Sequence, residues 1–182
     1  MSSIRGDVAR TSNEEFEQLA LPLLEPLYNF ARWLSGNSDE AKDLVQETFA
    51  KALKGFGGFQ SGTNFRAWIF RILHNTFLTS RTGLERQQTS HDDDNPIEEM
   101  PSTRDTPELL LIRRADTELV QAAIASLPLL FQEVILLADI EEMKYREVAE
   151  TLDIPIGTVM SRLARARKQI RKHILETLRK KS

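Results

Sequence analysis

The sequence predicts an all-α protein of two small helical domains joined by a flexible acidic linker, the second domain ending in a helix-turn-helix. Three observations lead to this expectation. Apolar residues recur at three- and four-residue spacing along most of the chain, whereas alternating strand patterns are almost absent. Residues 87–105 interrupt this pattern with a polar, acidic, proline-containing stretch. The last part of the chain combines a short helix, a tight turn and a long basic helix.

The first domain is expected over residues 1–86. Its first helix should break near Pro22 and kink near Pro26, because proline lacks a backbone donor. A second apolar stripe runs from Ala41 to Phe56, and a third helix begins after a glycine-rich loop, with Asn64 as its N-cap. The predicted inner face of this third helix contains Phe65, Trp68, Ile69, Ile72 and Thr76, and its outer face contains Arg71, His74, Asn75 and Leu78.

The linker is expected over residues 87–106 and the second domain over residues 107–182. Apolar residues at helical spacing continue to Leu127. A short helix is predicted from Pro128 to Ala138, another from Tyr145 to Leu152, and a long one over residues 156–179.

Charge is unevenly distributed along the chain. The net charge is −3, yet residues 156–182 carry nine basic and one acidic side chain, and residues 91–118 carry nine acidic and three basic ones. Such asymmetry predicts separate surfaces for different partners, and the basic end suits contact with phosphates. No apolar run approaches the roughly 20 residues of a membrane span, and the first ten residues lack the apolar part of a secretory signal. We therefore expect a cytoplasmic protein without membrane insertion.

The composition also bears on chemistry. The chain has no cysteine, which excludes disulfides and thiolate metal sites, and its three histidines lack zinc-ligand spacing. No phosphate-binding glycine loop or nucleophile elbow is present. We expect no catalytic residues, no metal and no cofactor, and hence not an enzyme.

The strongest functional pattern spans Tyr145–Lys172. An apolar stripe of Val159, Leu163, Ala166 and Ile170 should face the preceding helix, as in a DNA-reading helix. The outward residues are then Met160, Ser161, Ala164, Arg165 and Lys168, with Arg165 suited to a bidentate guanine contact. Arg162, Arg167, Arg171 and Lys172 are expected to neutralise phosphates. The alternatives are a solvated basic helix and a membrane-surface helix.

Three motifs carry a family resemblance. GTVMSRLARAR at Gly157–Arg167 resembles the promoter-reading helix of extracytoplasmic-function (ECF) sigma factors. DEAKDLVQETFAKAL at Asp39–Leu53 resembles their polymerase-binding helix, and FRAWIFRILHNTFL at Phe65–Leu78 resembles their promoter-melting helix. LPLLEPLY, FQSGTN and Met160 further resemble the subgroup controlled by zinc-containing anti-sigma factors.

The resemblance implies that the protein binds core RNA polymerase, through the β′ coiled coil and the β flap, and directs it to promoter DNA. The residues implied in polymerase binding are Asp43, Leu44, Gln46, Glu47 and Phe49, of which Leu44 and Phe49 add either apolar contact or core packing. From the residues alone, this surface reads instead as a solvated acidic face supported by a Glu47–Lys51 pair. An anti-sigma factor is the other implied partner, and it could hold the otherwise nucleoid-associated protein at the membrane.

The resemblance also implies two DNA contacts. Phe59, Gln60, Thr63 and Asn64 would surround a pocket for a base flipped from the minus-ten element, with Asn75 at a base edge and Arg71 at a phosphate. The plainer alternatives are that Phe59 is a buried loop anchor and Asn75 a surface residue. The outward residues of the last helix would read the minus-thirty-five element. Asp92, Asp93 and Asp94 in the linker would enter a basic polymerase channel, or simply belong to a tether.

Two other functions compete with this one. A stand-alone transcription regulator, with a helical dimerisation or ligand domain, would bind duplex operator tightly without polymerase. A helical adaptor would not bind DNA at all. The motif at Asp39–Leu53 favours the sigma factor over both.

Overall fold

The computed structural model describes residues 13–60, 62–82 and 117–181. Every regular element in these ranges is a helix, which confirms the all-α prediction. The chain forms two compact units, one consisting of Met1–Gln87 with Glu150–Leu152 and the other of Gln88–Ala149 with Asp153–Ser182. The predicted linker, with Asp92, Asp93 and Asp94, lies outside the described residues. Among the described helices, none has the length and apolar character needed to cross a membrane.

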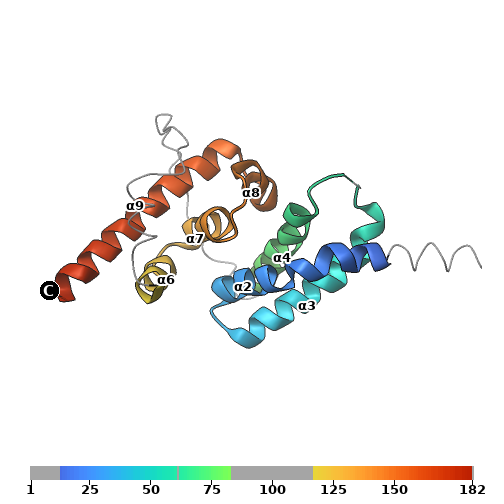
Figure 1. Cartoon of the computed structure of the whole chain (residues 1–182), viewed down its shortest axis with the longest axis horizontal. Coiled ribbons are helices and arrows are strands. Elements are labelled where there is room, and N and C mark those ends of the chain that lie inside the picture. The colour runs from blue at the N-terminus through green and yellow to red at the C-terminus, as the bar shows by residue number, and fades with distance from the viewer. Residues whose placement is uncertain (1–12, 61, 83–116, 182) are drawn as a thin grey trace, which may run out of the picture. The chain divides into compact units, whose positions relative to one another are not determined.

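The N-terminal unit is built from three helices, coloured blue to green in Figure 1. They are α2 (Leu24–Ser35), α3 (Ser38–Gly55) and α4 (Phe65–Thr82), preceded by helical residues 13–20 and the 3-10 turn η1 (Leu21–Leu23). Helices α2 and α3 pack against each other and both pack against α4. Phe30 and Phe70 meet in this core with ring centroids 5.6 Å apart, and both are almost completely buried. The apolar stripes of the three helices therefore share one core.

Two prolines shape the start of this unit. Pro22 lies in η1, between the helical residues 13–20 and α2, so the predicted break is present. Pro26 is the third residue of α2 and does not interrupt it. The first N–H groups of a helix have no acceptor one turn earlier, so proline removes no hydrogen bond there. The kink predicted at Pro26 is therefore absent.

A glycine and an asparagine separate α2 from α3. Gly36 adopts a left-handed backbone with φ 68°, and its N–H donates to the carbonyl of Arg32 at 2.9 Å. Asn37 is extended, and its side-chain oxygen accepts the N–H groups of Asp39 at 2.8 Å and Glu40 at 3.2 Å. These caps satisfy backbone groups at both helix ends. They determine where the motif at Asp39–Leu53 becomes helical.

One prediction about α4 is wrong. His74 was expected on the outer face, yet it is 5% exposed, and Phe70, Leu73 and Phe77 are also buried. Trp68, expected on the inner face, is partly exposed. Because both α2 and α3 pack on α4, its buried face is wider than the single stripe expected from periodicity, and it is turned toward Phe70 and His74.

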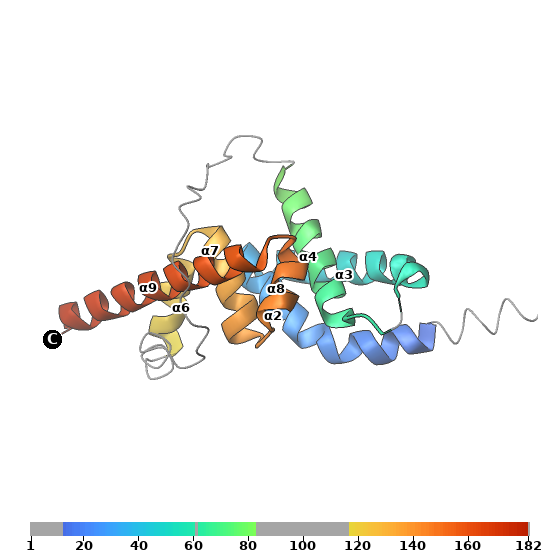
Figure 2. The same cartoon turned by 90° about the horizontal axis from the view of Figure 1, so that it is seen from above.

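The C-terminal unit contains four α-helices and a π-helical turn within its described residues. They are α6 (Thr117–Ala125), α7 (Leu129–Ile135), the π-helical η3 (Leu136–Ile140), α8 (Tyr145–Leu152) and α9 (Ile156–Lys181). Figure 2 shows α9 as a long rod, and both α6 and α7 pack against it. Val159, Leu163, Ala166 and Ile170 are buried on α9, which confirms the predicted inner stripe.

The π-helical turn is a departure from the single helix predicted over Pro128–Ala138. The N–H of Glu141 donates to the carbonyl of Leu136, five residues earlier, at 2.8 Å. A π turn holds one more residue than an α turn and changes the direction of the side chains within it. Periodicity did not reveal this insertion, because Leu136 and Leu137 are apolar and buried in either geometry.

Candidate nucleic-acid and polymerase-binding surfaces

A tight turn joins α8 to α9. Asp153 has a left-handed backbone with φ 56°, and its N–H and that of Ile154 both donate to the carbonyl of Ala149. This arrangement satisfies the Ala149 carbonyl near the end of α8, and the left-handed Asp153 turns the chain before Pro155. At the other end of α8, the carboxylate of Glu147 accepts the N–H of Lys144 at 2.7 Å. The predicted helix-turn-helix, with α8 over Tyr145–Leu152, is therefore present.

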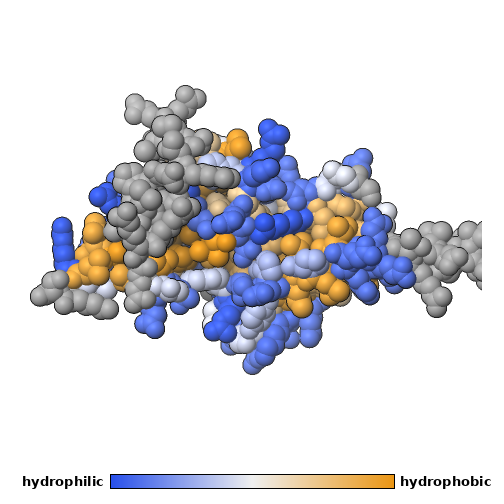
Figure 3. Space-filling model, viewed as in Figure 1, coloured by the Kyte–Doolittle hydropathy of each residue, from blue (hydrophilic) through white to orange (hydrophobic). Residues whose placement is uncertain are grey.

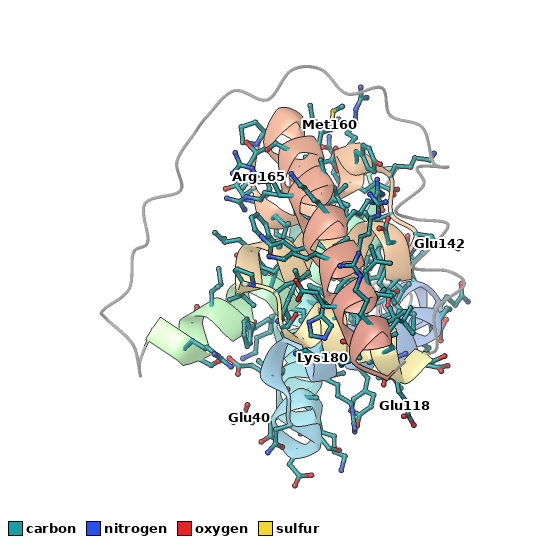
Figure 4. The ribbon with its side chains drawn as sticks, turned by 90° about the vertical axis from the view of Figure 1, so that its left-hand side faces the viewer. Glu40, Glu118, Glu142, Met160, Arg165 and Lys180 are labelled. Carbon is teal, nitrogen blue, oxygen red and sulfur yellow. The ribbon has the colours of Figure 1, made fainter. Side chains whose placement is uncertain are left out.

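The outward face of α9 contains the residues predicted to read bases. Met160, Ser161, Ala164 and Arg165 are partly exposed, and Lys168 is exposed. Figure 4 shows Met160 and Arg165 close to one end of α9, with Lys180 at the other. The opposite side of the same turns is buried through Val159 and Leu163. The geometry thus provides an anchored helix with an accessible face, and the DNA contacts themselves stay a prediction.

The four predicted phosphate contacts divide into two groups. Arg171 and Lys172 are exposed and Arg162 is partly exposed, as a phosphate contact requires. Arg167 is only 8% exposed, and its guanidinium donates to both carboxylate oxygens of Asp139, at 2.7 and 3.0 Å. The expectation that Arg167 presents its charge to phosphate is therefore wrong. Its side chain lies inside the unit, where Asp139 already accepts its hydrogen bonds.

Asp139 stabilises the charged form of the Arg167 side chain. Burial lowers the pKa of the Arg167 guanidinium, but the hydrogen bonds and negative charge of Asp139 outweigh this effect, and Tyr145 adds to it, so the pKa is raised overall. The Arg167 guanidinium is therefore charged at any physiological pH. The sequence contained no sign of this pair, since Asp139 lies 28 residues before Arg167 and inside the unforeseen π turn.

An aromatic cluster underlies the glycine-rich loop of the N-terminal unit. The loop follows α3 through the 3-10 turn η2 (Phe56–Gly58). Phe59 stacks on Phe56 with centroids 5.8 Å apart, and it also contacts Phe65 at 5.3 Å and Trp68 at 5.0 Å. Phe16 extends the cluster beneath Phe56 and Phe65. Phe59 therefore has the packing of a loop anchor, the plainer alternative to a base contact.

The loop after Phe59 is organised by its own hydrogen bonds. The carbonyl of Gln60 accepts both the N–H of Thr63 at 3.1 Å and its hydroxyl at 2.7 Å. Gly62 has φ 91°, a left-handed value that glycine adopts easily. The side-chain oxygen of Asn64 accepts the N–H of Ala67 at 3.1 Å, which confirms Asn64 as the N-cap of α4. The side chains of Gln60 and Thr63 in this loop are exposed.

The other two predicted minus-ten residues lie on α4. Arg71 and Asn75 are four residues apart, and both are exposed. Residues at this spacing share one face of a helix. Together with Gln60 and Thr63 they give the N-terminal unit a polar surface that includes the loop and one side of α4.

The acidic face of α3 is also accessible. Asp43, Gln46 and Glu47 are exposed, and Glu47 pairs with Lys51 at 2.7 Å. Leu44 is 7% exposed, so it belongs to the core and is not available to a partner as predicted. Phe49 is partly exposed and contacts Phe16 edge-on at 6.2 Å.

Lys51 adds a link that periodicity did not suggest. Its ammonium group donates to the hydroxyl of Thr76 at 3.2 Å, connecting α3 to α4.

Among the described residues, no group of three or more acidic or histidine side chains is arranged to hold a metal ion.

Hydrophobic side chains remain at the surface of both units beside hydrophilic ones (Figure 3). The exposed large apolar residues are Leu19, Leu21, Leu24, Leu53 and Leu78 in the N-terminal unit and Ile140, Ile156 and Leu178 in the C-terminal unit. Apolar side chains scattered singly over a surface are normal for a folded protein, so these residues by themselves mark no binding site.

Known families match both units. Residues 19–87 match the Sigma-70 region 2 family, and residues 117–170 match the Sigma-70 region 4 family. The chain is 33% identical to the ECF RNA polymerase sigma factor EcfG of Rhodopseudomonas palustris, over 82% of this chain and 80% of that protein. The chain belongs to the ECF sigma factors. It is also 35% identical to SigE of Mycolicibacterium smegmatis over 89% of its length, although it covers only 64% of that protein.

Two solved structures resemble this sigma factor. One is the sigma factor RpoE in complex with the anti-sigma factor NepR from Bartonella quintana, with a TM-score of 0.65 and 28% identity over 88% of this chain and 96% of that one. The other is CnrH in complex with the cytosolic domain of CnrY, with a TM-score of 0.65 and 25% identity over 94% of both chains. The region 2 match contains the loop with α4 and the acidic face of α3, and the region 4 match contains the outward face of α9.

Proposed function

We propose that this ECF sigma factor binds core RNA polymerase, directs it to specific promoters and helps to open the minus-ten element. The observation that carries the proposal is the presence of region 2 and region 4 matches in one chain, in that order. A stand-alone regulator would require the helix-turn-helix but not the region 2 unit, so this alternative is not favoured.

The exposed acidic face of α3 is the proposed contact with the β′ coiled coil. Asp43 and Glu47 offer carboxylates for basic partner side chains, and Gln46 lies between them. Phe49 can add apolar area at the edge, whereas Leu44 supports the helix from within the core. The region 4 unit is proposed to contact the β flap.

Promoter opening is assigned to the loop and α4. The aromatic cluster holds the loop in place, so Gln60 and Thr63 can border a base pocket without being ordered at the moment of binding. Asn75 can donate and accept at a base edge, and Arg71 can neutralise a phosphate on the same face. A trapped base would favour melting without ATP.

Reading of the minus-thirty-five element is assigned to α9. Arg165 suits a bidentate guanine contact, and Met160, Ser161, Ala164 and Lys168 complete the face. Arg162, Arg171 and Lys172 would add phosphate contacts.

An anti-sigma factor is the proposed regulator, since one similar solved structure is a sigma factor bound to the anti-sigma factor NepR and the other is CnrH bound to the cytosolic domain of CnrY. The resemblance in LPLLEPLY and FQSGTN favours a zinc-containing one. Such a partner would hold the otherwise cytoplasmic protein away from polymerase.

Run-off transcription tests the central proposal. Core polymerase with the purified protein should start transcripts at discrete genomic sites, and core polymerase alone should not. The protein by itself should bind duplex promoter poorly. Tight operator binding without polymerase, together with no promoter-specific transcript, would establish the stand-alone regulator instead.

A further inference from the structure

Three side chains join three consecutive elements of the C-terminal unit. Asp139 lies in η3, Tyr145 begins α8 and Arg167 lies in α9. The Arg167 Nε and Nη2 atoms donate to the Asp139 Oδ2 and Oδ1 atoms at 3.0 and 2.7 Å, and Nη2 also lies 3.4 Å from the Tyr145 hydroxyl oxygen. The Arg167 and Asp139 side chains are 10% and 14% exposed. This is a desolvated, two-bond ion pair rather than a surface contact.

The π turn determines where Asp139 points. The Glu141-to-Leu136 hydrogen bond spans five residues, and Asp139 lies inside the turn it closes. In a continuous α-helix the same residue would be rotated about the axis. Irregular turns of this kind are often retained at functional positions, because they direct one side chain at a cost in regular hydrogen bonding.

Arg167 in turn determines the rotation of α9. It lies two residues after Arg165, about 200° around the helix at 3.6 residues per turn. When Arg167 is held toward η3 and α8, Arg165 must point outward, where it is partly exposed beside Lys168. The apolar packing of Val159 and Leu163 tolerates small rotations of α9 about its axis. Two parallel hydrogen bonds to one carboxylate are directional and tolerate such rotations much less.

We infer that Arg167 is a positioning residue for promoter reading, which acts through Asp139 by setting the rotation of α9 and not by touching DNA. The inference rests on the proposed minus-thirty-five role of α9. A buried ion pair adds little net stability compared with apolar packing, but it can impose one geometry. The pair would thus contribute to the choice of base rather than to affinity for phosphate.

The Asp139→Asn variant distinguishes a phosphate-binding role of Arg167 from a positioning role, because the two roles predict different changes in promoter binding and in base preference. If Arg167 served phosphate, the substitution would release its charge and remove a nearby negative one, so holoenzyme binding would strengthen and base choice would persist. If Arg167 positions α9, preference should fall about tenfold at the base read by Arg165. The measurement is run-off transcription by reconstituted holoenzyme on a promoter library with a randomised minus-thirty-five element, followed by sequencing of the transcribed templates.

Three further variants guard against misfolding and loss of charge. Arg167→Lys keeps the charge but loses the two-bond geometry, so it should reproduce the lost preference. Lys172→Gln, at an exposed residue assigned to phosphate contact, should lower affinity across all templates without changing the preferred sequence. The double variant Asp139→Leu with Arg167→Met replaces the pair by apolar side chains and should fold, as judged by circular dichroism, yet select poorly.

The outcomes are distinguishable. Relaxed selection in Asp139→Asn, Arg167→Lys and the double variant, with unchanged minus-ten preference, supports the inference. Wild-type selection in any folded one of these variants overturns it while leaving the proposed function intact. Absence of promoter-specific transcripts with the wild-type protein overturns the proposed function and the inference together.

Discussion

The ring of Phe59 lies nearly parallel to that of Phe56, with an angle of 10° between their planes and centroids 5.8 Å apart. Phe59 belongs to the loop assigned to the minus-ten element, and Phe56 belongs to the buried end of η2. The stack therefore ties the proposed DNA-contacting loop to the core. Displacing the loop would therefore lower the free energy of unfolding of the N-terminal unit.

Phe59→Ala should destabilise the N-terminal unit by about 2 kcal/mol, because it removes a partly buried ring from an aromatic cluster. Urea unfolding followed by tryptophan fluorescence measures this. Phe59→Tyr keeps the ring and serves as the control. Unchanged stability combined with failure to open promoters would show instead that Phe59 acts on DNA and is not an anchor.

Asn37→Ala should lower the free energy of unfolding of the N-terminal unit by about 1 kcal/mol, since the backbone N–H groups of Asp39 and Glu40 lose their acceptor. Asn37→Ser, which retains a capping oxygen, should recover most of the loss. Chemical denaturation of the three proteins provides the comparison. An equal loss in both variants would indicate that the side-chain oxygen is not what stabilises the start of α3.

Asn75→Ala should impair opening of the minus-ten element more than polymerase binding. Its side chain is exposed, so stability should change by no more than about 0.5 kcal/mol. Permanganate reactivity of promoter thymines reports opening, and fluorescence anisotropy of labelled protein reports polymerase affinity. Arg71→Ala, on the same face, should weaken promoter binding in a salt-dependent way. If Asn75→Ala reduced opening and polymerase affinity equally, Asn75 would have a structural role.

Glu47→Gln should weaken polymerase binding by about 1 kcal/mol at low salt, and less at high salt, because an exposed charge contact is screened. Lys51→Gln is the matched control: it removes the other member of the 2.7 Å pair. It should leave polymerase affinity unchanged or slightly increased, since the Lys51 ammonium group no longer competes for the Glu47 carboxylate. Reduced affinity in Lys51→Gln but not in Glu47→Gln would contradict the acidic-face assignment.

Periodicity and capping residues predicted much of this fold. Tyr145–Leu152 was predicted as a helix with the observed bounds, because the turn residues after it permit no continuation. Asn64 was predicted as an N-cap from its residue type and place, and its side-chain oxygen accepts the predicted kind of hydrogen bond. These features depend on local sequence, which is why they can be read from it.

Features that depend on tertiary contacts could not be predicted in this way. His74 was placed outside because one stripe was assumed, whereas two helices cover α4. Arg167 was placed outside because arginine usually is, and its partner Asp139 is far away in sequence. Leu44 fitted both a core and a contact role, and only the packing decides. The predicted DNA and polymerase contacts themselves stay predictions.

The contact between Trp68 and Phe59, with centroids 5.0 Å apart, has a practical consequence. The chain has two tryptophans, Trp33 and Trp68, and both belong to the N-terminal unit. Replacement of Trp33 by phenylalanine would leave a single indole in contact with the loop. Its emission in the purified protein would then report local loosening of the loop from the aromatic cluster, without any attached dye.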